Sequence, residues 1–182
     1  MKCSIVLSTY NSPKWLEKVL WGYLAQTEDD FEVVIADDGS KEDTRELIQS
    51  FQGKFKHPIV HVWHPDNGFQ KTIILNKAIL ETNSNYLIFS DGDCVPRGDF
   101  IETHIRFREQ GYFLSGGYYK LPMGLSQKID EDDIQTQKAF DLKWMWKHGL
   151  PKSFKNLKLV ATKWNKEAFF NATTTTTPSW NG

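Results

Sequence analysis

Residues 31–51 read FEVVIADDGSKEDTRELIQSF, and this stretch contains one complete strand, loop and helix. The apolar run 31–36 predicts a buried strand, which the polar sequence DDGS ends. Ser40 with Asp43 predicts a capping box at the start of a helix whose apolar stripe runs to Phe51. A strand followed at once by a helix is the repeating unit of α/β proteins.

The same unit recurs on both sides of this stretch. Strands are expected at residues 3–7, 59–63 and 86–89, and helices at 13–24, 71–80 and 99–108. Ser12 and Pro13 provide an N-cap and a first-turn proline for the first helix. Repeats of this length predict an α/β fold with a mainly parallel sheet, helices on both faces and right-handed crossovers.

The pattern changes in the last third of the chain. Residues 112–121 predict a further strand, and residues 126–146 predict a helix. The acidic run 130–133 would lie in the first turns of that helix, where negative charge is favourable. Residues 149–151 (GLP) break the chain, and residues 157–161 predict a short strand.

The composition is that of an ordinary globular protein, with 182 residues, 40% hydrophobic and 25% charged. This length accommodates one sizeable core rather than two. The formal net charge of −1 gives no long-range attraction for nucleic acid, so no nucleic-acid partner is expected. The longest apolar runs are a few residues, and the N-terminus opens directly into a strand-like run. We expect a cytoplasmic protein, with a peripheral position at the inner face of the membrane as an open alternative.

Several conspicuous residues are expected to serve packing rather than chemistry. Cys3 and Cys94 each lie beside a strand-like run, where a reduced cysteine is a small core residue. His104 is expected to pack or cap rather than to bind a ligand. Trp144 and Trp146 have helical spacing and are expected in a core, with the edge of a binding pocket as the alternative.

Polar side chains follow three of the predicted strands, in residues 8–11, 37–38 and 91–93. Any one of these clusters is explained equally well as turn or cap chemistry. In an open parallel sheet, however, ligands bind at the carboxyl ends of the strands. The three clusters together therefore predict one binding site at this edge.

The sequence Asp91-Gly92-Asp93 is the most informative of the three clusters. Two carboxylates one residue apart offer the hard oxygen ligands that Mg²⁺ or Mn²⁺ prefers, and the glycine between them permits a tight turn. A divalent ion held there would bridge two phosphates and stabilise a diphosphate leaving group. The bare pattern occurs by chance in many loops, but its position after a strand strengthens it.

Four stretches of the chain occur in a characteristic order and at characteristic spacing. They are residues 5–11 (IVLSTYN), 34–40 (VIADDGS), 67–70 (NGFQ) with 76–79 (NKAI), and 89–96 (FSDGDCVP). This combination resembles glycosyltransferase family 2, whose members have the Rossmann-like GT-A fold. The resemblance covers about the first 120 residues.

The resemblance implies a role for each matching residue. Ser8 and Tyr10 would contact the nucleotide base, and Asp38 would accept a hydrogen bond from a uracil-like ring N–H. Asp91 would lie near the ribose and the metal, and Asp93 would be a direct ligand of the metal.

One position departs from the family pattern. After the Asn-Gly of residues 67–68, relatives often carry an arginine that faces the nucleotide. Gln70 and Lys71 occupy that stretch here, so both are expected to bind nucleotide, and Lys71 is expected to replace the charge.

The resemblance further implies transfer of a sugar from a nucleotide diphosphate-sugar, a UDP-sugar by preference, to a hydroxyl of a glycan or lipid-linked glycan. The family mostly inverts the anomeric centre, and the reaction needs a carboxylate that deprotonates the acceptor. In the family this base lies beyond a Gly-Gly-Asn-like stretch, well after the metal motif. Here Glu167 is the only carboxylate after Asp141, so we expect the base beyond Gly182.

An incomplete enzyme is therefore expected, able to bind donor but not to transfer sugar. Residues 1–122 would form the nucleotide-sugar-binding part, and residues 123–182 an incomplete acceptor-side part of the same domain. Apolar surface near Trp164 and Trp180 would then be exposed and favour self-association. If the base did lie within the chain, Glu167, Asp141 and the run 130–133 would be the candidates.

Two alternatives use similar sheets. A sugar nucleotidyltransferase usually has a glycine-rich and basic phosphate loop after its first strand, which the sequence STYNSP (residues 8–13) is not. A phospho-receiver module also gathers aspartates at strand ends, but it needs an acidic pair at the first strand, which here ends without an acid.

Overall fold

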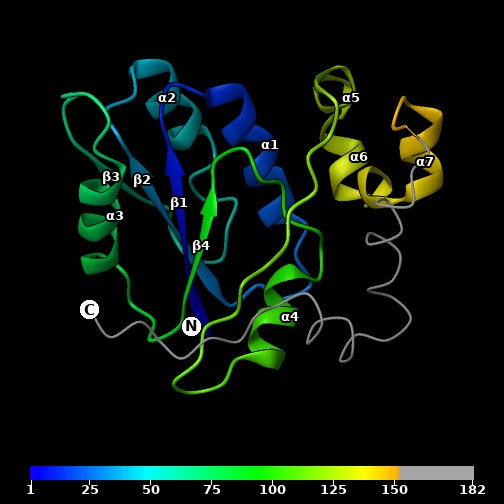
Figure 1. Ribbon diagram of the computed structural model, residues 1–182. Coiled ribbons are helices and arrows are strands. Elements are labelled where there is room, and N and C mark those ends of the chain that lie inside the picture. Colours follow the sequence, from blue (N-terminus) through cyan, green and yellow to red (C-terminus); the bar gives the residue numbers. More distant parts are fainter. Residues whose placement is uncertain (152–182) are drawn as a thin grey trace. The chain divides into compact units, whose positions relative to one another are not determined.

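The computed structural model describes residues 1–151, which fall into two compact units (Figure 1). The first unit is Met1–Ile101, and the second begins at Glu102. Within residues 1–151, no helix has both the length and the apolar composition needed to cross a membrane.

The first unit contains a four-stranded sheet with the order β3-β2-β1-β4, in which every neighbouring pair is parallel. Its strands are β1 (Cys3–Thr9), β2 (Phe31–Asp37), β3 (Val60–Trp63) and β4 (Leu87–Asp91). The helices that alternate with them are α1 (Pro13–Leu24), α2 (Glu42–Ser50) and α3 (Lys71–Leu80). A further helix, α4 (Phe100–Phe107), follows β4 and contains the boundary between the two units. The mainly parallel α/β sheet predicted from the alternation is therefore confirmed.

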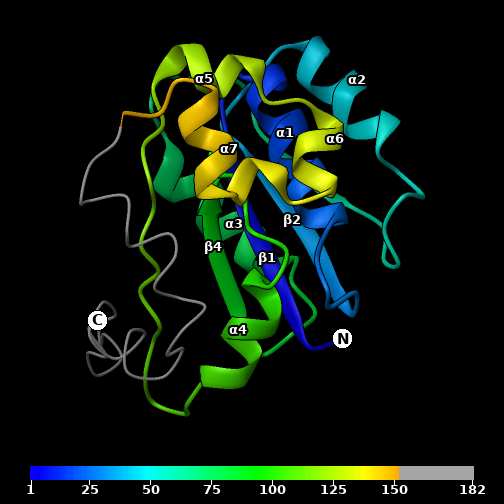
Figure 2. The same ribbon diagram turned by 90° about the vertical axis from the view of Figure 1, so that its right-hand side faces the viewer.

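The strand order reverses at β1. The chain runs outward from β1 through β2 to β3 and then returns to place β4 on the other side of β1 (Figures 1 and 2). With right-handed crossovers, this reversal places α1 and α2 on one face of the sheet and α3 on the other. Ligands bind at such a reversal, beyond the carboxyl ends of the two central strands.

The core has one apolar layer on each side of the sheet. Val6, Val34 and Ala36 pack against Ile74 and Ala78 of α3. On the opposite face, the ring of Tyr23 in α1 lies 6.2 Å from that of Phe31. Because β1 and β2 are buried on both faces, their sequences are nearly continuous apolar runs, as expected for a parallel sheet. Cys3 is buried in this core, as predicted.

The second unit contains short helices, α5 (Met123–Lys128), α6 (Glu131–Gln135), the 3₁₀ helix η1 (Lys138–Phe140) and α7 (Leu142–Lys147). Leu125, Leu142, Met145 and Leu150 form its core cluster, and Trp144 and Trp146 pack against that cluster. The packing interpretation of these tryptophans is thus confirmed. His104 is also buried, and burial lowers its pKa to about 4, so the neutral imidazole packs as predicted.

Two predicted elements of this part of the chain are wrong. Residues 112–121 form no strand, since only Tyr112 makes an isolated bridge and the consecutive glycines 116 and 117 offer no side chains to pack. The single helix predicted over residues 126–146 is broken where the backbone of Gln137 is left-handed, with φ 63°. Asp130 and Asp141 each cap a new helix with their side chains, so the acidic run does favour a helix start. The predictions for residues 157–161, Trp164, Glu167 and Trp180 lie outside the described residues.

Candidate functional site

The predicted polar clusters meet at the carboxyl edge of the sheet. Ser8 is the register partner of Asp91 across β1 and β4, and Thr9 is the partner of Asp37 across β1 and β2. The backbone N–H of Asp38 also donates to the carbonyl of Thr9 at 3.0 Å. Segments that are 28 to 83 residues apart in the sequence therefore lie side by side, at the point where the strand order reverses.

Ser8, Lys71 and Asp91 form one connected group. The Ser8 hydroxyl donates to Oδ1 of Asp91 at 2.8 Å, and Nζ of Lys71 in the first turn of α3 donates to the same oxygen at 2.6 Å. The Lys71 ammonium lowers the pKa of Asp91, and the bond from Ser8 adds to this effect against a partial opposing effect of burial. The Asp91 side chain is 55% exposed, so the group is open to solvent.

Asp91, Asp93 and Cys94 bring ligand atoms within 4.8 Å of one another. Asp93 is exposed, while Cys94 is half-buried, with its thiol 3.5 Å from a carboxylate oxygen of Asp93. Burial, assisted by the charge of Asp93, raises the pKa of Cys94 to about 11, so the thiol is protonated at neutral pH. The prediction that Cys94 is a core residue is wrong, because Cys94 lies in the loop after β4 and is only partly buried.

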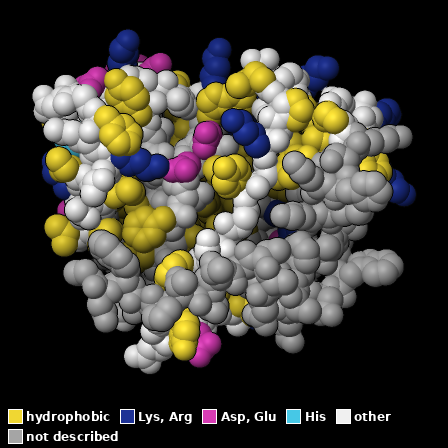
Figure 3. Space-filling model, in the orientation of Figure 1, with side chains coloured by type: hydrophobic (Ala, Val, Ile, Leu, Met, Phe, Trp, Pro, Cys, Tyr) yellow, Lys and Arg dark blue, Asp and Glu magenta, His cyan; other side chains and the backbone are white. Residues whose placement is uncertain are grey.

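Gly92 has a specific reason to be a glycine. Its N–H donates to the carbonyl of Ser8 at 2.8 Å, and a Cβ at this position would lie only 2.9 Å from that carbonyl oxygen. The close approach to β1 fixes where the two flanking carboxylates leave the sheet. Their oxygens suit a hard divalent cation such as Mg²⁺ or Mn²⁺, whereas the protonated thiol beside them is a poor ligand. On the face of the molecule seen in Figure 3, acidic and basic side chains lie next to each other.

Asp38 is bound on both carboxylate oxygens. Nε2 of His64 lies 2.7 Å from Oδ1, and the backbone N–H of Gln70 donates to Oδ2 at 3.0 Å. Asp38 and His64 are 6% and 5% exposed, so this pair is largely screened from water. Gln70 precedes α3, and Asp38 thus joins the ends of β2 and β3 to the start of that helix.

Asp37 and Ser40 organise the loop after β2. Asp37 accepts from Nε2 of His61 at 2.9 Å and from the N–H of Ser40 at 2.8 Å. Burial raises the pKa of Asp37, but the bonds from His61 and Ser40 outweigh it and leave the pKa below its usual value. The Ser40 hydroxyl accepts from the N–H of Asn11, so the predicted capping box with Asp43 is wrong. Instead α2 begins after Lys41, which makes no side-chain cap.

Tyr10 is held by a residue that the sequence patterns did not indicate. Its hydroxyl donates to Asp66 at 2.8 Å, and Asp66 also accepts from the N–H of Gly68 at 3.0 Å. The bond to Asp66 raises the pKa of Tyr10 and lowers that of Asp66. Gly39, with φ +94°, lets this loop approach, since its Cβ would lie 2.6 Å from Cα of Asp66.

The first unit thus brings all the predicted nucleotide and metal residues to one edge. Ser8, Lys71 and Asp91 are directly bonded, and Asp38 is bonded to the backbone of Gln70. Sequence reasoning missed the partners His61, His64 and Asp66. His64 could have been predicted, because it directly follows β3 and ligands bind at the carboxyl ends of parallel strands. Asp130, Asp133 and Asp141, named as fallback bases, serve as helix caps.

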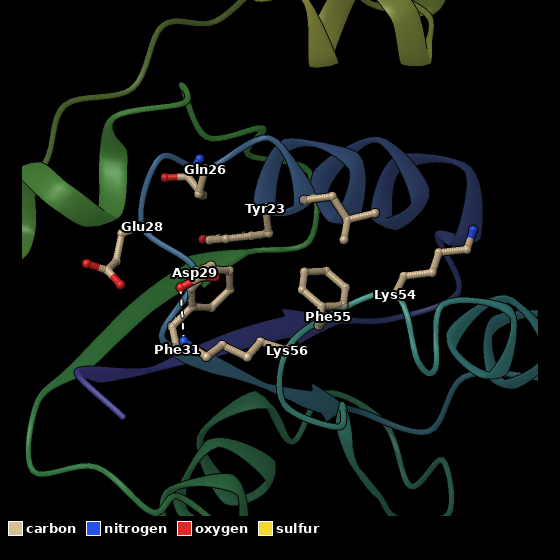
Figure 4. Close-up of a pocket in the computed structure, with 9 residues that line it drawn as sticks. Tyr23, Gln26, Glu28, Asp29, Phe31, Lys54, Phe55 and Lys56 are labelled. Atoms are coloured by element: carbon tan, nitrogen blue, oxygen red, sulfur yellow. Dashed lines mark hydrogen bonds and ion pairs between the residues drawn. The ribbon is translucent and has the colours of Figure 1, made fainter.

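A small cavity of about 70 Å³ lies elsewhere in the first unit (Figure 4). Tyr23, Phe31 and Phe55 form its aromatic wall, and Glu28 and Lys56 lie at its margin. These residues surround the amino end of β2, so the cavity is separate from the carboxyl-edge cluster. It contains none of the predicted site residues.

Comparison with known proteins gives a consistent result. The family model described as glycosyl transferase family 2 matches residues 4–163. An uncharacterised glycosyltransferase of Bacillus subtilis (strain 168), YfnE, is 31% identical over 144 residues, which are 76% of this chain and 36% of that protein.

Two solved structures share the fold. S. aureus TarS 1–349 in complex with UDP-GlcNAc matches with a TM-score of 0.54 and 21% identity, covering 69% of this chain and 38% of that one. The mannosyltransferase PcManGT from Pyrobaculum calidifontis, in complex with GDP-Man and Mn²⁺, matches with a TM-score of 0.51 and 19% identity, covering 60% and 33%. The chain thus spans less than two fifths of the length of each of these proteins.

Proposed function

Because this chain belongs to glycosyltransferase family 2, we propose that it binds a nucleotide diphosphate-sugar as part of an enzyme that transfers the sugar to a glycan hydroxyl. The observation that carries the proposal is the convergence of Ser8, Asp38, Asp91 and Asp93 at the reversal point of a parallel sheet. The donor complexes of TarS and PcManGT, which share the fold, support a nucleotide-sugar as ligand.

The nucleobase would bind at the ends of β1 and β2. Asp38 offers fixed acceptor oxygens to a ring N–H, which suits uracil, and Tyr10 and Ser8 would border the base from β1. We therefore propose UDP-sugar as the donor class. The bond from Tyr10 to Asp66 supports this role, because it holds the aromatic ring while leaving the side chain accessible.

The diphosphate would lie near the end of β4. Asp91 and Asp93 would hold Mn²⁺ or Mg²⁺, which when bound would neutralise the charge on the diphosphate leaving group. The Lys71 ammonium is bonded to Asp91 at this edge, so it would contact a phosphate oxygen and take the place of the arginine that relatives often carry. Gln70 would contribute mainly through its backbone, which is already bound to Asp38.

The proposal also covers the binding of the sugar acceptor. We propose residues 1–122 as the nucleotide-sugar-binding part and residues 123–182 as part of the acceptor side, with a glycan or lipid-linked glycan as acceptor and inversion as the stereochemical outcome. We also propose that the protein self-associates and that it is cytoplasmic, with a peripheral position at the inner face of the membrane as the alternative.

Calorimetric titration of the 182-residue chain with UDP, GDP and CDP, each with and without Mn²⁺, tests the proposal. We expect UDP to bind most tightly and Mn²⁺ to strengthen its binding. Asp93→Asn should remove most of the gain from Mn²⁺ while leaving metal-free UDP binding intact, because the substitution deletes one charged oxygen ligand. Equal UDP affinity with and without metal in the parent chain would contradict the metal role, and binding of none of the three nucleotides would contradict the proposed function.

A further inference from the structure

The His64 imidazole lies between a carboxylate and an ammonium group. Nε2 is 2.7 Å from Oδ1 of Asp38, and Nδ1 is 3.5 Å from Nζ of Lys77, at the outer limit of hydrogen-bonding distance. Lys77 is on α3, whereas His64 follows β3 and Asp38 follows β2. Three separate elements therefore meet in one short chain of polar contacts.

The neighbours of His64 determine its tautomer. A lysine ammonium only donates hydrogen bonds, and an ionised carboxylate only accepts them. Nδ1 facing Lys77 must therefore be the bare nitrogen, and Nε2 facing Asp38 must carry the hydrogen. A doubly protonated ring would direct a second N–H at the ammonium, so the neutral Nε2–H form fits this position.

The remaining hydrogen-bonding capacity of Asp38 follows from these contacts. One lone pair of each oxygen is used, by His64 and by the N–H of Gln70, and both of these partners are donors. The free lone pairs of the carboxylate can then only accept. With both oxygens held from the protein side, the carboxylate plane cannot rotate without breaking a bond to a largely buried partner.

We propose that His64, oriented by Lys77, is a positioning residue that holds the Asp38 carboxylate in a fixed orientation as a hydrogen-bond acceptor for the nucleobase. The inference rests on the proposed nucleotide-binding function. It predicts selection for bases with a ring N–H on the pairing edge, as in uracil N3–H and guanine N1–H. Cytosine presents a bare N3 at the corresponding position and would face the carboxylate with a second acceptor.

The adjacent His61–Asp37 pair provides a matched control. Nε2 of His61 lies 2.9 Å from Asp37, so both pairs join a histidine to a carboxylate between neighbouring strands at the same edge, at similar distances. Asp37, however, directs its other oxygen at the N–H of Ser40 in its own loop and is 1% exposed, against 6% for Asp38, so it is not expected to contact a ligand. Loss of His61 should therefore affect stability alone.

The test measures the UDP and CDP dissociation constants of His64→Leu, His64→Gln, Lys77→Met and His61→Leu by calorimetry, with thermal unfolding of each. We expect His64→Leu to weaken UDP binding by roughly tenfold and to lower the preference for UDP over CDP. Glutamine is long enough to place an amide N–H near the position of Nε2, so His64→Gln should restore UDP binding to within about threefold of the parent. Lys77→Met should have a smaller effect in the same direction, and His61→Leu should lower the melting temperature without changing the preference.

The nitrogen-15 NMR shifts of the His64 ring provide a second readout. We expect the signature of a neutral ring with hydrogen on Nε2, and loss of that single tautomer in Lys77→Met. A folded His64→Leu variant with parental UDP affinity and preference would overturn the inference, as would a ring with hydrogen on Nδ1. If the parent binds none of the nucleotides, the proposed function fails instead, so the two failures are distinguishable.

Discussion

Glu32 near the amino end of β2 and Asp91 at the carboxyl end of β4 are carboxylates of the same sheet with opposite surroundings. Glu32 is 3% exposed and accepts from the Ser4 hydroxyl and from both the backbone and the side-chain N–H groups of Asn83. The Asp91 side chain is 55% exposed and has Lys71 and Ser8 on a single oxygen. Glu32 therefore accepts three hydrogen bonds on its two oxygens, whereas both bonds of Asp91 fall on Oδ1 and leave Oδ2 available to a ligand.

A carboxylate that is buried and bonded on both oxygens, such as Glu32, stabilises the fold. An exposed carboxylate with a free oxygen, such as Asp91, can still bind a ligand. At the amino end, Glu32 ties together β1, β2 and the connection from α3 to β4, because the N–H of Ser84 also donates to Ser4. At the carboxyl end, the partners of Asp91 are the side chains of Lys71 and Ser8 rather than backbone groups. The same residue chemistry thus stabilises one edge of the sheet and leaves the other edge available.

The largest effect is expected from Glu32→Ala. The substitution leaves the buried Ser4 hydroxyl and the N–H groups of Asn83 without their acceptor, which should lower the free energy of unfolding by about 2–4 kcal/mol. Asp91→Ala is the matched control, and its effect on stability should stay within about 0.5 kcal/mol because the group is exposed. Urea unfolding measures both, and equal losses from the two variants would remove the distinction between the edges.

The next largest effect concerns ligand binding at the carboxyl edge. Asp38→Ala should weaken UDP binding by about 1.5–3 kcal/mol, the range for losing a hydrogen bond to a charged group. A milder variant of the amino-edge network, Glu32→Gln, serves as control and should bind UDP like the parent. An unchanged dissociation constant in a folded Asp38→Ala protein would place the nucleotide elsewhere.

The contribution of Glu32 to stability should depend on pH. Burial raises the pKa of Glu32, but the bonds from Ser4 and Asn83 outweigh it and hold the pKa below its ordinary value of 4.5. The folded state therefore binds this proton less readily than the unfolded state, so the stabilisation is complete above pH 4.5 and is lost as the pH falls through the folded pKa. The difference in unfolding free energy between the parent and Glu32→Gln should be constant from pH 7 to about pH 5 and shrink below that. A difference that stays constant down to pH 3 would contradict the lowered pKa.

The fold of the first unit was predictable because its strands and helices carry strong local patterns. Residues 71–80 were predicted as a helix with the observed bounds of α3, and the acidic clusters were expected at one edge because parallel strands end together. The second unit was less predictable, because Asp130 and Asp141 satisfy helix ends with their own side chains and so divide a stretch with continuous helical spacing. Such competition between side-chain and backbone hydrogen bonds depends on geometry rather than on hydrophobic period.

The partners of the site residues were harder to predict than the residues themselves. His64 lies 26 residues from Asp38, and Asp66 lies 56 residues from Tyr10. These pairs depend on the register of β2 against β3 and on the close approach of Gly39 to Asp66, which no local pattern encodes. Cys94 illustrates the same point, because its thiol lies beside the Asp93 carboxylate in the loop after β4 rather than in the core.

The smallest effect on stability, and the sharpest test of the open edge, is expected from Lys71→Met. The Lys71 and Asp91 side chains are 39% and 55% exposed, so losing their ion pair should change the free energy of unfolding by less than about 0.5 kcal/mol. Its effect on binding should depend on the metal. Without a divalent ion, UDP should bind several-fold more weakly, because the variant lacks the ammonium that we propose contacts the diphosphate.

The affinity of the same variant for Mn²⁺ alone should rise, because a cation that competes for Oδ1 of Asp91 has been removed. Calorimetry with UDP alone and with Mn²⁺ alone measures the expected loss of UDP affinity and the expected gain of Mn²⁺ affinity separately. Lys71→Arg is the matched control, since it keeps the charge and should keep both affinities near those of the parent. Weaker Mn²⁺ binding in Lys71→Met would show that Lys71 assists the acidic pair rather than competing for it, and the edge would then be less open than its exposure indicates.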